Sequence, residues 1–252
     1  MIEFPAWLPL AFFAVATLYS MAGFAGGSSY LMLLVLAGIS HTQAPSIALL
    51  CNIVVSSCTF WQYRRSGHFN IKMSLPFVLG SVPASYLAAR MITLPKEIFF
   101  TLLGSSLLIA ASRLFFIGRV IEKKEAVIPR RPWMIAIPTG GLLGFLSGLL
   151  GIGGGIFLSP VLLFMRWADA KKAAAAASFF ILVNSLSGLL GQVQKGAFHP
   201  GSSLLFLALA ALIGGQIGAC LGAGRLPRTG LQRVTALLLL YISINFLCKA
   251  FS

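Results

Sequence analysis

Apolar residues fill most of this chain in long runs, and short polar turns divide these runs into ten segments. From residue 4 to residue 63 there is no Asp, Glu, Lys or Arg, which leaves room for several membrane crossings of about 20 residues each. No segment alternates between apolar and polar residues, and lipid offers no partner to an open strand edge, so helices are predicted. The predicted helical segments are residues 4–22, 26–40, 43–63, 72–90, 95–117, 132–150, 153–166, 170–194, 201–223 and 228–250.

The two halves of the chain carry the same signals in the same order. The glycine-rich run 23–27 corresponds to the run 151–155, and further matches follow at a spacing that drifts from 128 to 134 residues. These matches are Gly67-His68-Phe69 with Gly196-Ala197-Phe198, Leu94-Pro95-Lys96 with Leu226-Pro227-Arg228, and Thr101 with Thr235. The sequence therefore predicts two membrane repeats, residues 1–117 and 132–252, joined by a cytoplasmic linker over 118–131.

Charge is distributed unevenly between the two sides that this topology defines. The turns after the third, fifth, seventh and ninth segments hold fifteen basic and three acidic residues, a net charge of +12. The opposite side holds four basic and two acidic residues, a net charge of +2. Because Lys and Arg collect in cytoplasmic loops, both termini are predicted to lie outside the cytoplasm. Five segments per repeat is an odd number, so the repeats are predicted to have inverted topology, as in many secondary transporters.

The second segment of each repeat is unusually short. The seventh segment, about 14 residues at about 1.5 Å each, reaches only about 21 Å, against about 30 Å for a hydrocarbon core. The turns before these segments contain glycine and serine but no charge. The first two segments of each repeat are therefore either complete tilted spans or a hairpin with its tip near the membrane midplane, and we favour the hairpin.

Glycine-rich tips at membrane depth would need partners for their backbone amides. Consecutive amides at the start of a helix form a concave anion-binding surface, and the helix N-terminus adds partial positive charge. No Asp or Glu lies within any predicted span, which argues against a cation as the ligand. Two opposed tips are therefore predicted to converge on a small anion with several oxygen atoms.

Polar side chains near the tips could complete such a site, because hydroxyl and amide groups bind anion oxygens without fixing a charge in the membrane. The candidate substrate-binding residues are Gly26, Gly27, Ser28, Ser29, Asn52, Gly153, Gly154, Gly155, Ser178 and Asn184, with Ser185 as a further polar neighbour. Structural roles compete with binding, since glycine permits close packing of membrane helices and Ser and Asn hydrogen-bond between them. Gly222 is interpreted as such a packing glycine.

The remaining polar residues suggest no second site. Asp169 precedes a helix-forming run and is interpreted as an N-cap, and His41, at the corresponding position of the first half, as a surface histidine or a proton site. The four cysteines lie within apolar runs without a CxxC pair, so they are interpreted as packing residues, and three scattered histidines form no ligand cluster. Neither a metal nor a cofactor is predicted.

The net charge of +14 would suggest a nucleic-acid partner in a soluble protein. Here the chain is 58% hydrophobic and only 10% charged, and basic cytoplasmic loops explain the excess. The predicted partners are therefore a small anion and the lipid bilayer rather than nucleic acid, and a homodimer is compatible with the sequence.

The second-half motif, Gly151-x-Gly153-Gly154-Gly155-x4-Pro160-x-Leu162, together with its degenerate first-half copy, resembles the TauE/SafE sulfite exporter family, also called the toluene-sulfonate uptake permease family. The resemblance extends over nearly the whole chain through its length, duplication and alanine-rich eighth segment. The first copy departs from the motif with Ala25 in place of a third glycine and Met32 in place of the proline. The eighth segment has Ala177-Ser178 where family members commonly have Thr-Ser.

This resemblance implies a multi-pass carrier in the inner membrane of a prokaryotic cell that moves small, often sulfur-containing anions such as sulfite, sulfoacetate or aromatic sulfonates. We expect a secondary transporter that exports such an anion. Two other classes compete with this expectation: a membrane assembly or scaffold protein that transports nothing, and an intramembrane enzyme. No span contains paired carboxylates or a Ser–His or Cys–His pairing, so we do not expect an enzyme.

Overall fold

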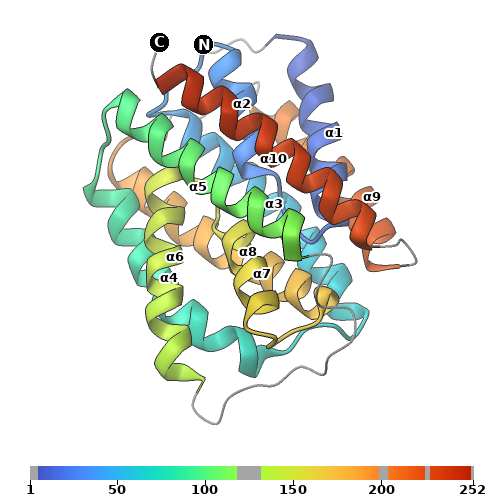
Figure 1. Ribbon diagram of the computed structural model, residues 1–252. Coiled ribbons are helices and arrows are strands. Elements are labelled where there is room, and N and C mark those ends of the chain that lie inside the picture. Colours follow the sequence, from blue (N-terminus) through green and yellow to red (C-terminus); the bar gives the residue numbers. More distant parts are fainter. Residues whose placement is uncertain (1–4, 118–131, 199–203, 225–227, 251–252) are drawn as a thin grey trace.

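The computed structural model describes residues 5–117, 132–198, 204–224 and 228–250. Within these ranges all regular structure is helical, and ten helices follow one another along the chain (Figure 1). The helices are α1 (Trp7–Met21), α2 (Gly27–Leu36), α3 (Ala44–Arg65), α4 (Ile71–Met91), α5 (Lys96–Ile117), α6 (Trp133–Leu150), α7 (Gly155–Phe164), α8 (Ala170–Gln194), α9 (Leu204–Ala223) and α10 (Arg228–Ala250). The predicted ten helical segments are confirmed, while the predicted linker 118–131 lies outside the described residues.

The outer surface of the bundle is apolar. Large hydrophobic side chains such as Leu10, Met134 and Phe206 are more than half exposed, which a water-soluble protein of this size would avoid. Among the described helices, α3, α6, α8 and α9 are long and apolar enough to cross a membrane, and α1, α2 and α7 are shorter apolar helices. The chain is therefore an all-α polytopic membrane protein.

The short helices α2 and α7 are each 10 residues long, or about 15 Å. Each begins after a glycine with a left-handed backbone, Gly26 at φ +99° and Gly154 at φ +73°, a conformation that side-chain-bearing residues rarely adopt. We call residues 23–29 the first tip and residues 151–157 the second tip. Every residue of both tips is buried, so neither tip lies at the surface of the bundle. Their depth in the membrane stays a prediction.

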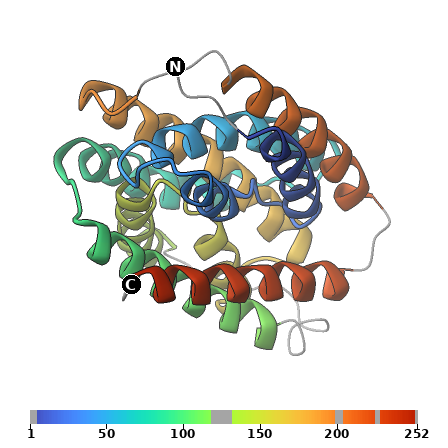
Figure 2. The ribbon, with the colours of Figure 1, turned by 90° about the horizontal axis from the view of Figure 1, so that it is seen from above.

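The packing of the helices repeats between the two halves. Helices α3 and α8 contact each other at the centre, with α9 packed on α3 and α4 packed on α8. Outside them, α1 packs on α9 and α6 packs on α4, while α5 and α10 lie side by side along one face (Figure 2). If each helix of the first half is replaced by its counterpart in the second half, α1 by α6 and so on to α5 by α10, the same set of contacts results. The α1–α9 contact, for example, becomes the α6–α4 contact. This is the packing that two repeats related by a two-fold axis would produce.

The two halves also run in opposite directions in Figure 1, where α1 begins at the top of the molecule and α6 begins at the bottom. Helix α10 ends at the top, on the same side as the start of α1. An inverted repeat would have this arrangement, although the inversion relative to a membrane stays a prediction.

Two glycine stripes allow the peripheral helices to approach their partners closely. On α6 the stripe is Gly140, Gly144 and Gly148, and on α9 it is Gly214, Gly218 and Gly222. A methyl group on Gly148 would lie 2.7 Å from Ser85 Cα of α4, and one on Gly222 would lie 2.6 Å from Met21 Cα of α1. Backbone therefore meets backbone at both interfaces, as small residues permit in membrane proteins. Gly222 is a packing glycine, as the sequence indicated.

Asp169 is the N-cap of α8, as expected. Its Oδ1 accepts hydrogen bonds of 2.9 Å from the amides of Lys171 and Lys172. Burial would raise the pKa of this carboxyl, but the two amides and the charge of Lys172 more than offset that effect and hold the pKa below its ordinary value. His41 is half-buried, and its ring lies 6.0 Å from the ring of Phe99.

The cysteines differ in their surroundings. Cys51 is buried, whereas Cys58 is half-buried and Cys220 and Cys248 are exposed on the outer helix surface. Within the described residues none of the four takes part in a disulfide. The packing interpretation is right for Cys51 and wrong for Cys220 and Cys248, because the sequence does not reveal which side of an all-apolar helix faces inward.

Candidate functional site

The two tips meet at Asn52, near the middle of the central helix α3. A methyl group on Gly27 of the first tip would lie 2.9 Å from Asn52 Oδ1, and one on Gly153 of the second tip would lie 3.2 Å from Asn52 Nδ2. One carboxamide is therefore in contact with the glycine backbone of both repeats. A side chain larger than hydrogen at either glycine would displace the carboxamide.

Asn52 has no solvent exposure, and neither atom of its carboxamide has a hydrogen-bond partner. A buried amide without partners is costly, so its presence calls for an explanation. Other buried polar atoms share this condition. The described side-chain atoms that are buried without a partner are the hydroxyls of Ser28, Tyr30, Ser147 and Ser185, both polar atoms of Asn52, and Asn184 Oδ1.

Several of these groups surround the second tip. A methyl group on Gly153 would lie 2.8 Å from Ser185 Oγ of α8, and one on Gly154 would lie 3.2 Å from Ser147 Oγ of α6. Ser147 is at the end of α6, just before the tip, and Ser185 is in the middle of α8. The second tip thus lies among an amide and two hydroxyls that come from three different helices.

Two tyrosine side chains lie beside the first tip. The hydroxyl of Ser29 donates a hydrogen bond of 2.9 Å to the hydroxyl of Tyr19 in α1. Gly26 lies beside Tyr30, whose ring stacks on Phe12 with the ring centroids 4.4 Å apart. The two halves therefore contribute unequally: tyrosine side chains lie beside the first tip, whereas the second tip lies beside the serine hydroxyls together with Phe180 and Ile181 of α8.

The tips also supply backbone donors. The first amides of any helix have no carbonyl partner within that helix, and neither α2 nor α7 has a capping side chain. In α7 the amide of Gly155 donates to the carbonyl of Gly153 at 3.1 Å, and the amide of Phe157 donates to the carbonyl of Gly154 at 3.0 Å, so these two amides already have partners. Both helices direct their positive N-terminal ends into the buried cluster.

Three of the residues expected at the site already donate hydrogen bonds to other protein groups. The hydroxyl of Ser178 donates to the carbonyl of Ala175 in its own helix, at 2.9 Å. Asn184 Nδ2 donates to Ser81 Oγ of α4 at 2.9 Å and to the carbonyl of Phe180 at 2.8 Å. Together with Ser29, these residues make hydrogen bonds within or between helices. Gly155 packs its backbone against the carbonyl of Ala177.

No charged side chain enters the cluster. The buried polar residues among those described are Ser, Thr, Asn and Gln, and none is Asp, Glu, Lys, Arg or His. No group of three metal-ligating side chains occurs in the described part of the chain. What the cluster offers is a set of neutral donors with two helix N-termini, which can hydrogen-bond the oxygens of a small anion.

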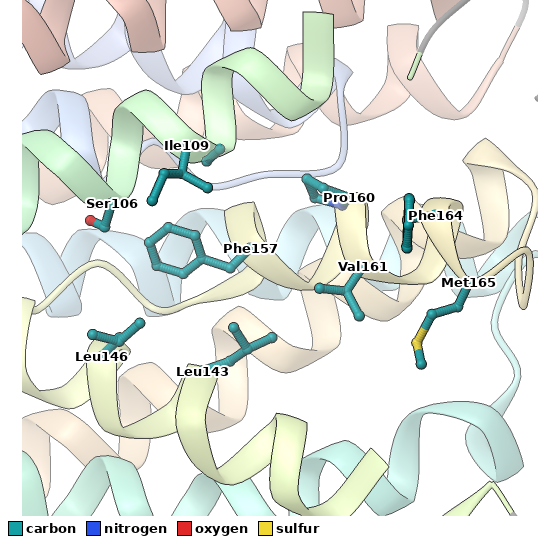
Figure 3. Close-up of a pocket in the computed structure, with 10 residues that line it drawn as sticks. Ser106, Ile109, Leu143, Leu146, Phe157, Pro160, Val161, Phe164 and Met165 are labelled. Carbon is teal, nitrogen blue, oxygen red and sulfur yellow. The ribbon is translucent and has the colours of Figure 1, made fainter. Parts of the chain in front are cut away.

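A separate cavity of about 420 Å³ lies between α5, α6 and α7 (Figure 3). Its lining is apolar, with Leu143 and Leu146 from α6 facing Phe157 of α7. The hydroxyl of Ser106, which also lines it, donates to the carbonyl of Leu103 in its own helix. This cavity provides no anion donors, and none of the unpartnered polar atoms belongs to its lining.

Sequence reasoning missed three residues of the cluster: Ser147, Tyr19 and Tyr30. Tyr19 and Ser147 occupy corresponding positions, 128 residues apart, in the last turns of α1 and α6. A signal was therefore available, since a residue four positions before the first glycine of each run would point toward the following tip. The correspondence was missed because a large tyrosine in the first half corresponds to a small serine in the second.

The apolar exterior and the polar cluster enclosed between two short-helix tips define a polytopic helical membrane protein with a polar interior. The chain belongs to the Sulfite exporter TauE/SafE family, whose sequence model matches residues 8–246. This finding confirms the family that the glycine motif indicated. The family is one of membrane transporters, and no solved structure significantly matches the chain.

Relatives occur in bacteria, archaea and plants. The probable membrane transporter protein y4hK of Sinorhizobium fredii is 32% identical over 95% of this chain and 97% of its own length. The probable membrane transporter protein MJ0441 of Methanocaldococcus jannaschii is 25% identical over 75% of this chain and 73% of its own. Sulfite exporter TauE/SafE family protein 1 of Arabidopsis thaliana is 33% identical over 38% of this chain and 21% of its own length.

Proposed function

We propose that this protein is a secondary transporter that exports a small, sulfur-containing oxyanion, such as sulfite, sulfoacetate or another sulfonate, through the inner membrane of a prokaryotic cell. The observation that carries the proposal is the meeting of both glycine tips at the unpartnered carboxamide of Asn52. A ligand with several acceptor oxygens would satisfy donors that the protein itself leaves unsatisfied.

In this proposal the substrate is held between the two repeats. Gly23 of the first tip packs against Ala174 at the start of α8, and Gly151 of the second tip packs against Pro45 at the start of α3. Each tip therefore rests on the central helix of the other repeat. A movement of one repeat against the other would change both tips together, as alternating access between two inverted repeats requires.

The direction of transport follows from the charge of the substrate. The described spans contain no buried Asp, Glu or His that would carry a coupled proton or bind sodium. An anion that moves alone responds to the membrane potential, which favours its exit from a cell that is negative inside by about 2.3 kcal/mol per charge per 100 mV. Export is the direction that this gradient drives.

Orientation completes the proposal. The exposed residues Arg64 and Arg65, at the C-terminal end of α3, and Lys172, at the N-terminal end of α8, lie on the side that we assign to the cytoplasm. Arg90, at the C-terminal end of α4, lies on the side that we assign to the exterior. The excess of basic residues on the first side supports a location of both termini outside the cytoplasm.

A non-transporting scaffold protein would make different predictions from a carrier. A scaffold has no use for a buried cluster of unpartnered donors and would not be stabilised by any small anion. A carrier at a ligand concentration of 100 times its Kd would gain about 2.7 kcal/mol of stability. Thermal unfolding of the purified protein with sulfite, methanesulfonate and chloride therefore separates the two.

The variant that tests the site most directly is Ser185→Ala. Its hydroxyl is buried without a partner in the protein, so its removal should not lower stability. It should weaken sulfite binding about tenfold, since a hydrogen bond to a charged group contributes about 1.5 kcal/mol. The matched control is Ser187→Ala in the same helix, whose hydroxyl donates to the carbonyl of Val82 at 2.6 Å. Ser187→Ala should bind sulfite as the wild type does. Equal binding by all three proteins would exclude the second tip as the site.

A further inference from the structure

We infer that the cluster around Asn52 selects singly charged oxyanions, and that its form of sulfite is hydrogensulfite rather than the doubly charged sulfite ion. This inference rests on the transport function proposed above and names the charge class of its substrate. Of the anions named there it excludes sulfoacetate, whose sulfonate and carboxylate groups are both charged near neutral pH. Two independent features of the cluster carry it: the neutrality of its donors, and the unpartnered acceptor that the Asn52 carboxamide presents.

The donors of the cluster are all uncharged. They are the amide of Asn52 and the hydroxyls of Ser147 and Ser185, to which the N-termini of α2 and α7 add only partial positive charge. No buried basic side chain is described that could balance a second negative charge. Lys195, which follows α8, is half-buried, and its Nζ donates to the carbonyl of Ile92, just after α4, at 2.5 Å.

The physics of burying an anion then favours one charge over two. The cost of removing an ion from water rises with the square of its charge, whereas its attraction to fixed dipoles rises only in proportion to the charge. A second charge on the same ion therefore increases the cost about fourfold and the gain only about twofold. With no Lys or Arg in the cluster, no positive charge offsets the additional cost of burying a doubly charged anion.

The second feature is the Asn52 carboxamide, both of whose polar atoms lack a partner. Whichever way the carboxamide is turned, one of these atoms is an oxygen that accepts hydrogen bonds and repels a fully deprotonated anion. Hydrogensulfite carries one proton that it can donate to this oxygen, while its remaining oxygens accept from the Asn52 amide and the serine hydroxyls. The doubly charged sulfite ion has no such proton and would leave the acceptor unpaired.

Titration of the side chains near the cluster would not affect the pH dependence of anion binding around neutral pH. They are Tyr19 of α1, Tyr30 of α2 and Cys51 of α3, and groups of these types ionise above neutral pH in water. The described parts of α6, α7 and α8 present no buried Asp, Glu, Lys, Arg or His to the cluster. Sulfite itself exchanges its second proton near neutral pH, so the ligand is the group whose titration dominates.

The experiment measures ligand binding by the purified protein between pH 6 and pH 9, with sulfite, methanesulfonate and sulfate as probes. The apparent affinity for total sulfite should fall about tenfold per pH unit above the second ionisation of sulfite, as the fraction of hydrogensulfite falls. Methanesulfonate keeps one charge throughout but has no proton to donate to the Asn52 oxygen, so it should bind more weakly than hydrogensulfite. Its affinity should stay constant with pH and thereby exclude titration of the protein. Sulfate, doubly charged throughout, should bind at least tenfold more weakly than methanesulfonate.

Two results would overturn the inference and leave the transport function intact. One is an affinity for total sulfite that is constant or rises through this pH range, and the other is binding of sulfate as tight as that of methanesulfonate. If none of the three anions binds at any pH, the proposed function itself fails. The variant Asn52→Leu should lose binding of all singly charged probes, because both the donor and the acceptor at the meeting point of the tips are removed.

Discussion

The two buried asparagines of the central helices should respond in opposite ways to the same substitution. Asn52 of α3 has no hydrogen bond through its carboxamide, whereas Asn184 Nδ2 of α8 donates to Ser81 Oγ and to the carbonyl of Phe180. Leucine has nearly the shape of asparagine and removes only the polarity. We therefore expect Asn52→Leu to stabilise the protein in the absence of ligand and Asn184→Leu to destabilise it.

The magnitudes follow from the partners of each side chain. A buried polar group without a partner costs about 1–3 kcal/mol, so the replacement of the Asn52 carboxamide by methyl groups should raise the free energy of unfolding by about 1–2 kcal/mol. Hydrogen bonds between membrane helices contribute about 0.6 kcal/mol each on average. The loss of both bonds of Asn184 should lower the free energy of unfolding by about 1 kcal/mol, because Ser81 keeps its hydrogen bond to the carbonyl of Val78.

The assay is the equilibrium unfolding of each variant in mixed micelles of a mild detergent and sodium dodecyl sulfate, without added anion. Asn52→Leu should be more stable than the wild type without anion, and added anion should no longer stabilise it. This trade-off is expected where a functional group is retained although it lowers stability. If Asn52→Leu destabilises the protein as much as Asn184→Leu does, the Asn52 carboxamide has a structural partner, and the reasoning that makes it a ligand-binding group is refuted.

Two further predictions concern packing and topology. In α6, Gly144→Ala should destabilise the protein by about 1–3 kcal/mol, because the methyl group would lie 2.6 Å from Ser81 Cβ. The control Gly141→Ala, whose methyl group would have its nearest neighbour at 3.7 Å, should be neutral or stabilising. Equal unfolding midpoints of the two variants in the same micelles would contradict the packing of α6 on α4. In a background without native cysteines, Ser40→Cys in the exposed turn before α3 should react with a membrane-impermeant thiol reagent in intact cells, and Ser66→Cys after α3 should react only after permeabilisation. The reverse pattern would place both termini in the cytoplasm.

Much of the fold could be read from the chain because the membrane restricts what a sequence can do. Lipid leaves no partner for an unpaired backbone group, so long apolar runs become helices and their breaks become tips or turns. The glycine runs located both tips, and the short segments after them became the 10-residue helices α2 and α7. Helix ends such as the Asp169 cap depend on neighbours within one turn, and these too were visible in the sequence.

The roles of individual polar side chains could not be read in the same way. Asn52 and Asn184 look alike in the sequence, each in the middle of an apolar helix, yet one lies between the two tips and the other is bonded to α4. Ser147 attracted no attention in the sequence and proved to be one of the unpartnered hydroxyls beside the second tip.

The sequence by itself determined the class of protein, the helices and the family, because these depend on composition, periodicity and short-range geometry. Only the tertiary structure decided which polar groups share a cluster. The neighbours of Asn52 are Gly27, 25 residues before it, and Gly153, 101 residues after it in the other repeat. Contacts of this kind depend on how each helix is rotated and how the repeats pack, and apolar helices whose outer faces meet lipid carry little amphipathic signal from which that rotation could be deduced.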